Sequence, residues 1–460
     1  MDVISDLAES IVTTRYENLP RQAVKIAREF IVDTIGVGIA GSGSAGNNAI
    51  IELLHEWGGQ PESTVFVHGI RLPAPEAAFA NSLLIHSADY DDTDDRTATH
   101  TNVCALPAAL ALAEKLHCDG KAVITAVALG VDLTCRLALA SNLFHGWHNT
   151  STVGIFGAAA AAGKTLGLDR IQMVNALGIA YSQAAGNRQG REDGAMTKRL
   201  QPAFATRAGV VAALLAQRGV TGARNVIQGQ WGLFRLYRDY RRKYEPDQWA
   251  ALLRDGLGTR FEGVNLSAKP YPCVRCAHAP IDGALELAAK HDLNPEKVME
   301  VIVGTNERVL DTAGKPFAIR TDPEVDAKFS IPYVVAVALS KRKVTLADFK
   351  EEAIRTPALA ALAAKVKVVL DPEFRGSRSV VGPVKVKVKM SDGRELATRV
   401  ELARGHLQNP MNERDFANKF RECVMQSAIP IAEQKIERLL RLLNRLEEIA
   451  DVGEVIQLTA

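Results

Sequence analysis

The sequence predicts a mainly α-helical protein that combines a large all-helical domain with a smaller α+β domain. A chain of 460 residues is longer than one hydrophobic core usually serves. Helical apolar spacing dominates its first half, and β-branched runs with a period of two appear later. We therefore expect an all-helical domain over residues 1–262, an α+β lid domain over residues 263–402, and C-terminal helices over residues 403–460 that complete the helical domain.

The N-terminal part is expected to contain a series of packed helices. The segment after Pro20 places Val24, Ala27 and Ile31 on one helical face, and Gly41 ends the pattern. The alanines of residues 158–162 let neighbouring helices approach closely, which predicts the centre of a bundle. The other expected elements are helices over residues 47–57, 75–88, 103–117, 119–140, 150–166, 168–185 and 197–218, and a short strand over residues 64–69.

The lid domain is expected to mix strands with helices. Residues 391–393, Ser-Asp-Gly, stand between two β-branched runs and predict a hairpin. The tail from Asn412 to Ile449 is helical in pattern again. The expected strands cover residues 298–306, 365–370, 384–390 and 394–402, and the expected helices cover residues 280–291 and 330–339.

Composition argues against several functional classes. A net charge of +2, without a basic patch, gives no field that would attract nucleic acid. We find no apolar run of the roughly 18–20 residues that a membrane span needs, and the N-terminus lacks the form of a signal peptide. The six cysteines are scattered, which fits a reducing compartment. We therefore expect a cytoplasmic protein that binds neither nucleic acid nor a membrane.

The stretch from His86 to Leu106 is the densest group of titratable side chains in the chain. Like charges this close raise carboxyl pKa values unless cations or hydrogen-bond donors lie nearby. Residues 91–95, DDTDD, also match the magnesium-binding DDxxD signature of all-α terpenoid synthases. That chemistry needs a second acidic ligand set and an aromatic cavity, whereas aromatic residues make up only 6% of the chain. We therefore expect no metal site, and expect most of these aspartates to be helix caps or a partly solvated loop face.

Three other patterns resemble motifs but are better explained by structure. Residues 158–165 loosely match a phosphate-binding loop, although their alanines favour a continuous helix. The glycines of residues 36–41 match a dinucleotide fingerprint, but a helical pattern, not a strand, leads into them. The pair Cys273-x-x-Cys276 has no second ligand pair at zinc spacing.

Cationic and proton-carrying side chains that could pair with the acidic stretch occur in four other clusters. They are His145 and His148 before a helix, Arg188, Arg191 and Lys198 in a polar loop, Lys269 at the domain junction, and Tyr333 at the start of a lid helix. We see no serine or cysteine triad and no nicotinamide-binding loop. This inventory indicates proton abstraction next to a carboxylate.

The same residues carry a resemblance to the MmgE/PrpD family, whose members include 2-methylcitrate dehydratase, cis-aconitate decarboxylase and iminodisuccinate epimerase. The resemblance runs over nearly the whole chain, with several motifs in the family's order. The motifs are DYDDT (89–93), TH (99–100), GWH (146–148), GIFGAAAAAGKTLGL (154–168), GAMTKRLQ (194–201), AKPYPC (268–273) with His278, FSIPY (329–333) and GHLQNPMNERDFANKF (405–420).

The resemblance implies a cofactor-free enzyme, usually a homodimer, with its active site between the helical domain and the lid. Lysine ammonium groups would hold substrate carboxylates, and imidazoles would exchange protons near neutral pH. Carried over by motif, the catalytic residues would be Asp89, Thr93, His100, His148 and Tyr333, and the substrate-binding residues would be Lys198 and Lys269, with Arg188 and Arg191 as helpers.

We expect a lyase that removes water from a small di- or tricarboxylate similar to 2-methylcitrate. Epimerisation is one alternative within the family, because His100 and His148 supply two bases. Decarboxylation of a substrate similar to cis-aconitate is another. A decarboxylase-like member is expected to carry a histidine near Val274, where this chain reads YPCVRCAH.

Overall fold

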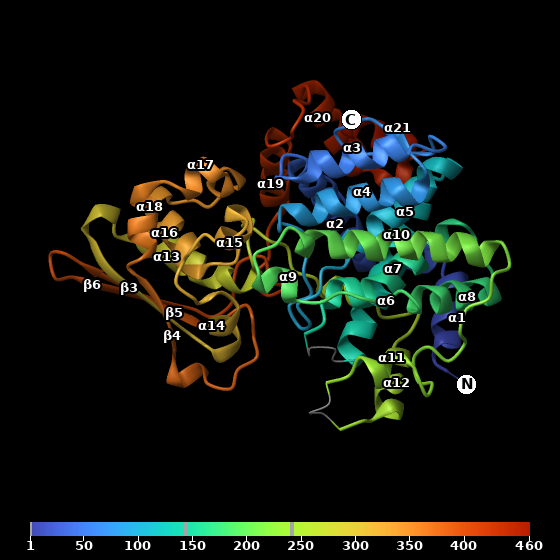
Figure 1. The fold of residues 1–460 in the computed structure, drawn as a ribbon, viewed down its shortest axis with the longest axis horizontal. Helices are drawn as coiled ribbons and strands as arrows, with labels where there is room; N and C mark the ends of the chain where they lie inside the picture. The colour runs from blue at the N-terminus through green and yellow to red at the C-terminus, as the bar shows by residue number, and fades with distance from the viewer. Residues whose placement is uncertain (1, 142–145, 240–242) are drawn as a thin grey trace.

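The structure, a computed structural model, describes residues 2–141, 146–239 and 243–460. Two parts lie side by side (Figure 1). The larger part is helical and contains both chain ends, and the smaller part combines a four-stranded sheet with helices. The predicted fold class, mainly α with a smaller α+β part, is confirmed.

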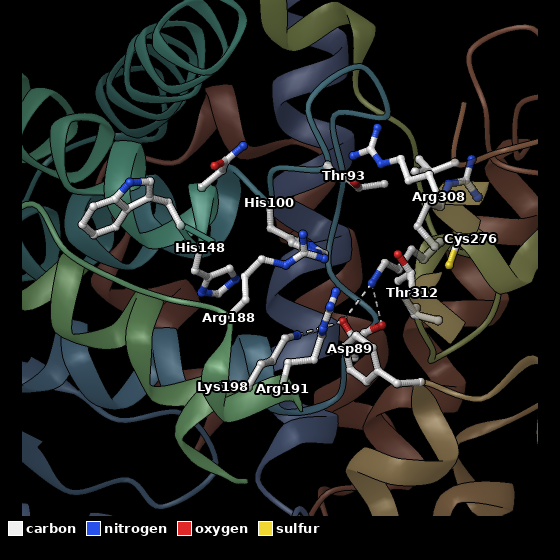
Figure 2. A pocket seen from close by; sticks show the side chains of 18 of the residues that line it. Asp89, Thr93, His100, His148, Arg188, Arg191, Lys198, Cys276, Arg308 and Thr312 are labelled. Atoms are coloured by element: carbon white, nitrogen blue, oxygen red, sulfur yellow. Dashed lines mark hydrogen bonds and ion pairs between the residues drawn. The ribbon is translucent and has the colours of Figure 1, made fainter. Parts of the chain in front are cut away.

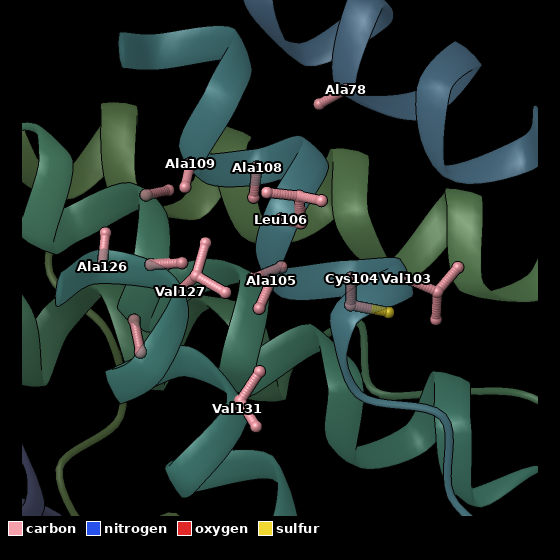
Figure 3. Packing of buried hydrophobic residues seen from close by; sticks show 14 of the residues in the cluster. Ala78, Val103, Cys104, Ala105, Leu106, Ala108, Ala109, Ala126, Val127 and Val131 are labelled. Atoms are coloured by element: carbon pink, nitrogen blue, oxygen red, sulfur yellow. The ribbon is translucent and has the colours of Figure 1, made fainter. Parts of the chain in front are cut away.

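Helix α7 (Asn149–Thr165) lies at the centre of the helical part and packs against α5, α6, α8 and α10. The alanines of residues 158–162 are fully buried. A Cβ atom at Gly209 of α10 would lie 2.6 Å from the Cβ of Ala158, so glycine allows the close approach of these two helices. Figure 3 shows alanine and valine side chains packed between α5 and α6, among them Ala105 and Val127. The other helices of this part are α1 (Ile4–Thr13), α2 (Arg21–Gly41), α3 (Asn47–Trp57), α4 (Ala74–Ser87), α5 (Asn102–Leu116), α6 (Gly120–Ser141), α8 (Arg170–Tyr181), α9 (Gln189–Glu192), α10 (Thr197–Gln217), α11 (Leu233–Leu236), α12 (Pro246–Arg254), α19 (Glu413–Met425), α20 (Glu433–Leu443) and α21 (Gly453–Ile456).

The glycines of residues 36–41 lie inside α2 and serve helix packing. A Cβ atom at Gly41 would lie 1.8 Å from the carbonyl oxygen of Leu84, and one at Gly36 would lie 2.8 Å from the Phe420 ring. The phosphate-loop pattern is likewise inside α7, and Lys164 at its end donates a hydrogen bond to the carbonyl of Val12 at 2.8 Å. Neither pattern forms a nucleotide-binding loop.

Helix α6 corrects one expectation from the sequence. Residues Gly120–Ala140 form a helix that is long and apolar enough to cross a membrane, with a mean hydropathy of 1.8. Of that apolar window, 89% is buried inside the protein, where α6 packs against α5 and α7. The hydropathy of α6 is therefore accounted for by its place in the core.

The sheet of the α+β part has the strand order β4-β3-β5-β6. Strands β3 and β4 are parallel, and the other two pairs are antiparallel. In β5 the valines face the core while Lys385, Lys387 and Lys389 face outward, as the alternating sequence predicts. The strands are β3 (Val298–Thr305), β4 (Val366–Leu370), β5 (Val384–Met390) and β6 (Glu395–Val400), and a two-stranded ribbon in the helical part comprises β1 (Ser63–Thr64) and β2 (Arg71–Leu72). The helices are α13 (His278–Lys290), α14 (Glu307–Ala313), α15 (Pro323–Lys328), α16 (Ile331–Lys341), α17 (Glu351–Ile354) and α18 (Pro357–Ala363).

The chain passes between the two hydrophobic cores in two places. Ala268 belongs to the core of the helical part and Tyr271 to that of the α+β part. On the return, Ala403 belongs to the α+β core, and α19 packs against α2 in the helical part. After the return, Lys419 of α19 lies 2.7 Å from Asp33 of α2, and away from both crossings Arg199 of α10 lies 2.9 Å from Asp322 of the α+β part, so buried ion pairs fasten α19 to the helical part and the two parts to each other.

Candidate active site

A cleft of about 850 Å³, open solvent at its mouth included, lies between the helical part and the α+β part. Every site residue expected from the sequence lines it, with the exception of Tyr333. Figure 2 shows His148 and Arg188 on one side of the cleft and Arg308, Cys276 and Thr312 on the other. The lining residues are Asp89, Thr93, Ala98, His100, Trp147, His148, Asn149, Asn187, Arg188, Arg191, Lys198, Lys269, Val274, Arg275, Cys276, Arg308, Thr312, Phe329 and Val380.

Asp89 joins Lys198 and Lys269, which both line the cleft, and Figure 2 shows its contact with Lys198. Asp89 follows α4 and has a left-handed backbone conformation, with φ of 52°. Its Oδ1 accepts hydrogen bonds from Lys269 Nζ at 3.0 Å and from Lys198 Nζ at 3.2 Å. Lys269 also donates to the Asp89 carbonyl at 2.9 Å. Burial alone would raise the pKa of Asp89, but the two ammonium groups outweigh it and hold this pKa well below its usual range. Asp89 is therefore a fixed anion that positions two cations.

His100 and His86 converge on one buried carboxylate, that of Asp91. The Nδ1 atom of His86 lies 2.8 Å from Asp91 Oδ2, and the Nδ1 atom of His100 lies 3.3 Å from the same oxygen. Burial, with the Lys198 ammonium, lowers the pKa of His86 to about 4, so this imidazole is neutral at pH 7. Burial also opposes ionisation of Asp91, but the two histidines outweigh it and hold its pKa well below the usual range.

His148 is the N-cap residue of α7 and brings a second imidazole to the cleft. Its backbone N–H donates to the carbonyl of Gly186 at 3.1 Å, which ties it to the loop that carries Arg188. Burial, together with His86 and Lys198, lowers the pKa of His148 well below its usual range. This imidazole is therefore neutral and able to accept a proton. His145, from the same predicted cluster, lies outside the described residues.

The aspartates of residues 91–95 each have partners, and Asp91, Asp92 and Asp94 are buried, so the expected solvated loop face is wrong for them. Asp92 accepts hydrogen bonds from the backbone N–H groups of Thr101 and Asn102 at 3.0 and 3.2 Å, which stabilises the start of α5 as a helix cap. Asp94 pairs with Arg96 at 2.8 Å, and Asp95 pairs with Arg275 at 3.0 Å. These carboxylates form ion pairs with cations of the protein or accept hydrogen bonds from its backbone. Residues 91–95 are therefore not a magnesium–diphosphate site, although they match the DDxxD signature.

Three groups, His86, Asp91 and His100, lie close enough together to be considered as a metal site, because their candidate ligand atoms all lie within 4.8 Å of one another. The sequence does not predict this group. His86 and Asp91 are already joined at hydrogen-bond distance, and the nearby Lys198 ammonium, which lowers the pKa of His86, would also repel a cation. A hydrogen bond between His86 and Asp91, with His100 at ion-pair distance from the same carboxylate, therefore fits these three side chains better than a metal ion does.

Arginines from both parts of the protein give the cleft a positive charge. Burial, with Arg191 and then Arg308 as neighbours, lowers the pKa of Arg188 to about 10, which leaves it charged at pH 7. Arg308, on α14, and Arg275, at the domain junction, were missed from the sequence. The sequence around Arg308 contains no motif that would predict a residue of the active site. Guanidinium groups crowded together in this way are relieved by a bound anion.

Tyr333 does not reach the cleft, which corrects its assignment as a catalytic residue. Its side chain is fully buried in the core of the α+β part, and its hydroxyl donates to the carbonyl of Asp348 at 2.5 Å. The FSIPY motif has a structural role instead, because the Ser330 side chain caps α16 by accepting a hydrogen bond from the Tyr333 N–H at 3.3 Å. A residue in a motif shared with a family can therefore be needed for the fold and not for catalysis, and the motif alone does not distinguish the two roles.

Replacing Tyr333 by phenylalanine should test this correction. The variant keeps the ring and loses one buried hydrogen bond, so we expect the free energy of unfolding to fall by about 1 kcal/mol and kcat to stay within about two-fold of the wild type. Chemical denaturation and steady-state kinetics measure the two quantities. A fall in kcat of about 100-fold would return Tyr333 to the catalytic residues.

Comparisons with known proteins identify the family to which the chain belongs. The MmgE/PrpD N-terminal domain matches residues 5–245, and the MmgE/PrpD C-terminal domain matches residues 271–445. Human cis-aconitate decarboxylase is 27% identical, over 98% of this chain and 93% of the relative. The Aspergillus terreus cis-aconitate decarboxylase is 26% identical over 96% and 93%. The 2-methylcitrate dehydratase of Cupriavidus necator is 25% identical over 88% and 86%. With both domains matched and a cleft between them, this chain belongs to the MmgE/PrpD family.

Proposed function

We propose that the protein is a lyase that needs no metal or organic cofactor and removes water from a small di- or tricarboxylate. The observation that carries the proposal is the cleft itself, which combines paired lysines, arginines and two histidines. These are the groups that proton abstraction next to a carboxylate requires. The relatives act on cis-aconitate and 2-methylcitrate by their names, which supports a polycarboxylate substrate.

The cations would hold the substrate and stabilise its developing charge. Lys198 and Lys269 each contact Asp89, so their ammonium groups are fixed before substrate binds, and little reorganisation is needed. Arg188 and Arg191 enter from the helical part and Arg308 from the α+β part, so a bound polycarboxylate would contact both. Because guanidinium groups bind carboxylates in bidentate fashion, they would orient the substrate.

The two cleft histidines would carry the proton transfers. Neutral His148 would take the proton from the carbon next to a carboxylate. The electron pair released would form the carbon–carbon double bond as the carbon–oxygen bond breaks. The leaving hydroxide would take a proton from protonated His100, which lies beside the Asp91 carboxylate, and depart as water. Thr93, a buried residue that lines the cleft, would donate a hydrogen bond to the substrate.

Decarboxylation is the second candidate, and the names and full-length matches of the cis-aconitate decarboxylases favour it. In that reaction the carbon–carbon bond to a carboxylate breaks, carbon dioxide leaves, and protonated His100 would deliver a proton to the resulting carbanion. Val274 favours dehydration, because it lines the cleft where a histidine is expected in a decarboxylase-like member.

Separate incubations with 2-methylcitrate and cis-aconitate, followed by proton NMR in H₂O and D₂O, distinguish the candidates. We expect an unsaturated tricarboxylate from 2-methylcitrate, no release of carbon dioxide, and turnover that survives EDTA. Carbon dioxide from cis-aconitate would establish the second candidate instead. Exchange of a substrate hydrogen for deuterium without an unsaturated product would indicate an epimerase, and loss of turnover with EDTA would overturn the metal-free mechanism.

A further inference from the structure

The chain His86–Asp91–His100 is buried behind the wall of the cleft, and only its last member reaches the substrate side. The side chains of His86 and Asp91 are fully buried, whereas that of His100 is 13% exposed. The Nδ1 atom of His100 is buried 3.3 Å from Asp91 Oδ2, at ion-pair distance but without a hydrogen bond to it, which leaves Nε2 as the nitrogen that can face the cleft. His86 does not line the cleft, and it reaches the lining only through the ring of His100, whose centroid lies 5.0 Å from its own, and that of His148, at 5.9 Å, within the described residues.

We propose that Asp91 and His86 are positioning residues for His100. Asp91 holds the Nδ1–H form of the His100 imidazole and so presents Nε2 to the substrate. His86 donates its own Nδ1–H to Asp91 and fixes that carboxylate in place. The proposal rests on the proposed function, because it assigns His100 to proton transfer.

The burial of Asp91 explains why this support is strong. Its Oδ2 receives both histidine contacts, and within the described part of the chain its Oδ1 is buried without a hydrogen-bond partner. A desolvated carboxylate attracts a neighbouring positive charge more strongly than an exposed one does. Protonation of His100 supplies that charge next to Asp91, so Asp91 favours the acid form of His100.

Several charged or titratable groups from other elements also face this chain, and their balance decides the direction of the effect. Lys198 opposes protonation of His86 and His148, while the Asp91 carboxylate favours protonation of His86. Among the described residues, Asp91 is the one that forms an ion pair with the His100 ring. The surrounding groups are Asp89 and Asp92 on the same loop, Lys198 on α10, Lys269 at the domain junction, His148 at the start of α7, Asp33 on α2 and Cys104 on α5.

Asp91→Asn is the central variant, because it keeps the shape of the side chain and removes its charge. We expect kcat to fall by about 100-fold or more, with KM within about three-fold, because only proton transfer is impaired. His100 would act as the acid, so activity falls at alkaline pH, where the acid has lost its proton. Loss of the Asp91 charge makes the protonated acid less stable, so the alkaline limb of the kcat profile should move down by about one pH unit or more.

Asp94→Asn is the matched control. Asp94 is a buried aspartate of the same loop, but it pairs with Arg96 and does not line the cleft. We expect its alkaline limb to stay where it is in the wild type. His86→Ala should shift the limb in the same direction as Asp91→Asn, and His86→Asn, which keeps an amide N–H near the place of Nδ1, should reverse part of that shift.

Nitrogen-15 NMR of histidine-labelled protein tests the proposal without any substrate. We expect the wild-type His100 signal to show the Nδ1–H form, and expect Asp91→Asn to raise the share of the Nε2–H form. This result would stand even if the protein failed to catalyse lyase chemistry, so the two proposals can fail separately. An unchanged limb and an unchanged His100 signal in Asp91→Asn would overturn the positioning role, as would a stoichiometric metal ion bound to this chain in the purified protein.

Discussion

Replacing His148 by alanine is expected to lower kcat by about 100- to 10,000-fold, the contribution usual for a positioned general base. Burial and the neighbouring His86 and Lys198 hold the pKa of His148 well below its usual range, so it is available as a base throughout the neutral range. The helix start depends little on the side chain, because the His148 carbonyl accepts the N–H groups of Ser151 and Thr152 at 3.0 Å. Steady-state kinetics on the substrate that is turned over measures the effect, and circular dichroism checks the fold.

His55→Ala is the matched control for His148, because His55 is an exposed histidine on α3 outside the cleft lining. We expect its kcat to equal that of the wild type within about two-fold. If His148→Ala kept full turnover as well, the assignment of His148 as the base would be wrong. His100 would then have to act as both the base and the acid.

Acidification from pH 6.5 to pH 5 is expected to destabilise the fold through three buried neutral histidines, His86, His148 and His278. The pKa of His86 is lowered to about 4, chiefly by burial, and burial also holds the pKa values of His148 and His278 well below their usual range. The unfolded chain takes up protons near pH 6.5, so it binds more protons than the folded chain in this window. Above pH 6.5 these histidines do not lower the free energy of unfolding. By pH 5 each of them lowers it by about 2 kcal/mol.

Carboxylates with raised pKa values, such as Asp33, Asp92 and Asp132, act in the opposite direction at lower pH, so the prediction is best tested as a difference. His278 suits this test because it is fully buried and does not line the cleft. In His278→Gln, the free energy of unfolding should depend on pH less steeply than in the wild type, by about 1.4 kcal/mol per pH unit between pH 6.5 and 5. His55→Ala should keep the wild-type slope, and equal slopes in all three proteins would disprove the neutral buried state of His278.

Most of the fold could be predicted because its signals are local. The valine–lysine alternation of β5 and the Ser-Asp-Gly hairpin after it lie within a few residues, and the structure has both where the sequence places them. The alanines of residues 158–162 predicted the bundle centre, and they are fully buried in α7. Short helices such as α14, α15 and α17 were missed, since segments of four to seven residues carry too few turns to show a period.

Part of the site could be predicted from the sequence. The errors concern residues whose role depends on partners far away along the chain. Asp89, His148 and Lys198 stand in motifs shared with a family, and the cleft gathers them. Tyr333 stands in a shared motif too, but its hydroxyl is held by Asp348 inside the α+β core. Arg308 carries no local signal, because only the packing of α14 brings it opposite Arg188.

The sequence by itself determined the fold class, the family and the types of side chain in the cleft, because periodicity and motifs are properties of neighbouring residues. Only the tertiary structure decided what each aspartate of the stretch from His86 to Leu106 does. Asp91 supports two histidines, Asp92 caps a helix and Asp95 pairs with Arg275, 180 residues away along the chain. The physical reason is that burial makes each charge depend on its partners, and those partners come from distant elements that meet only when the chain folds.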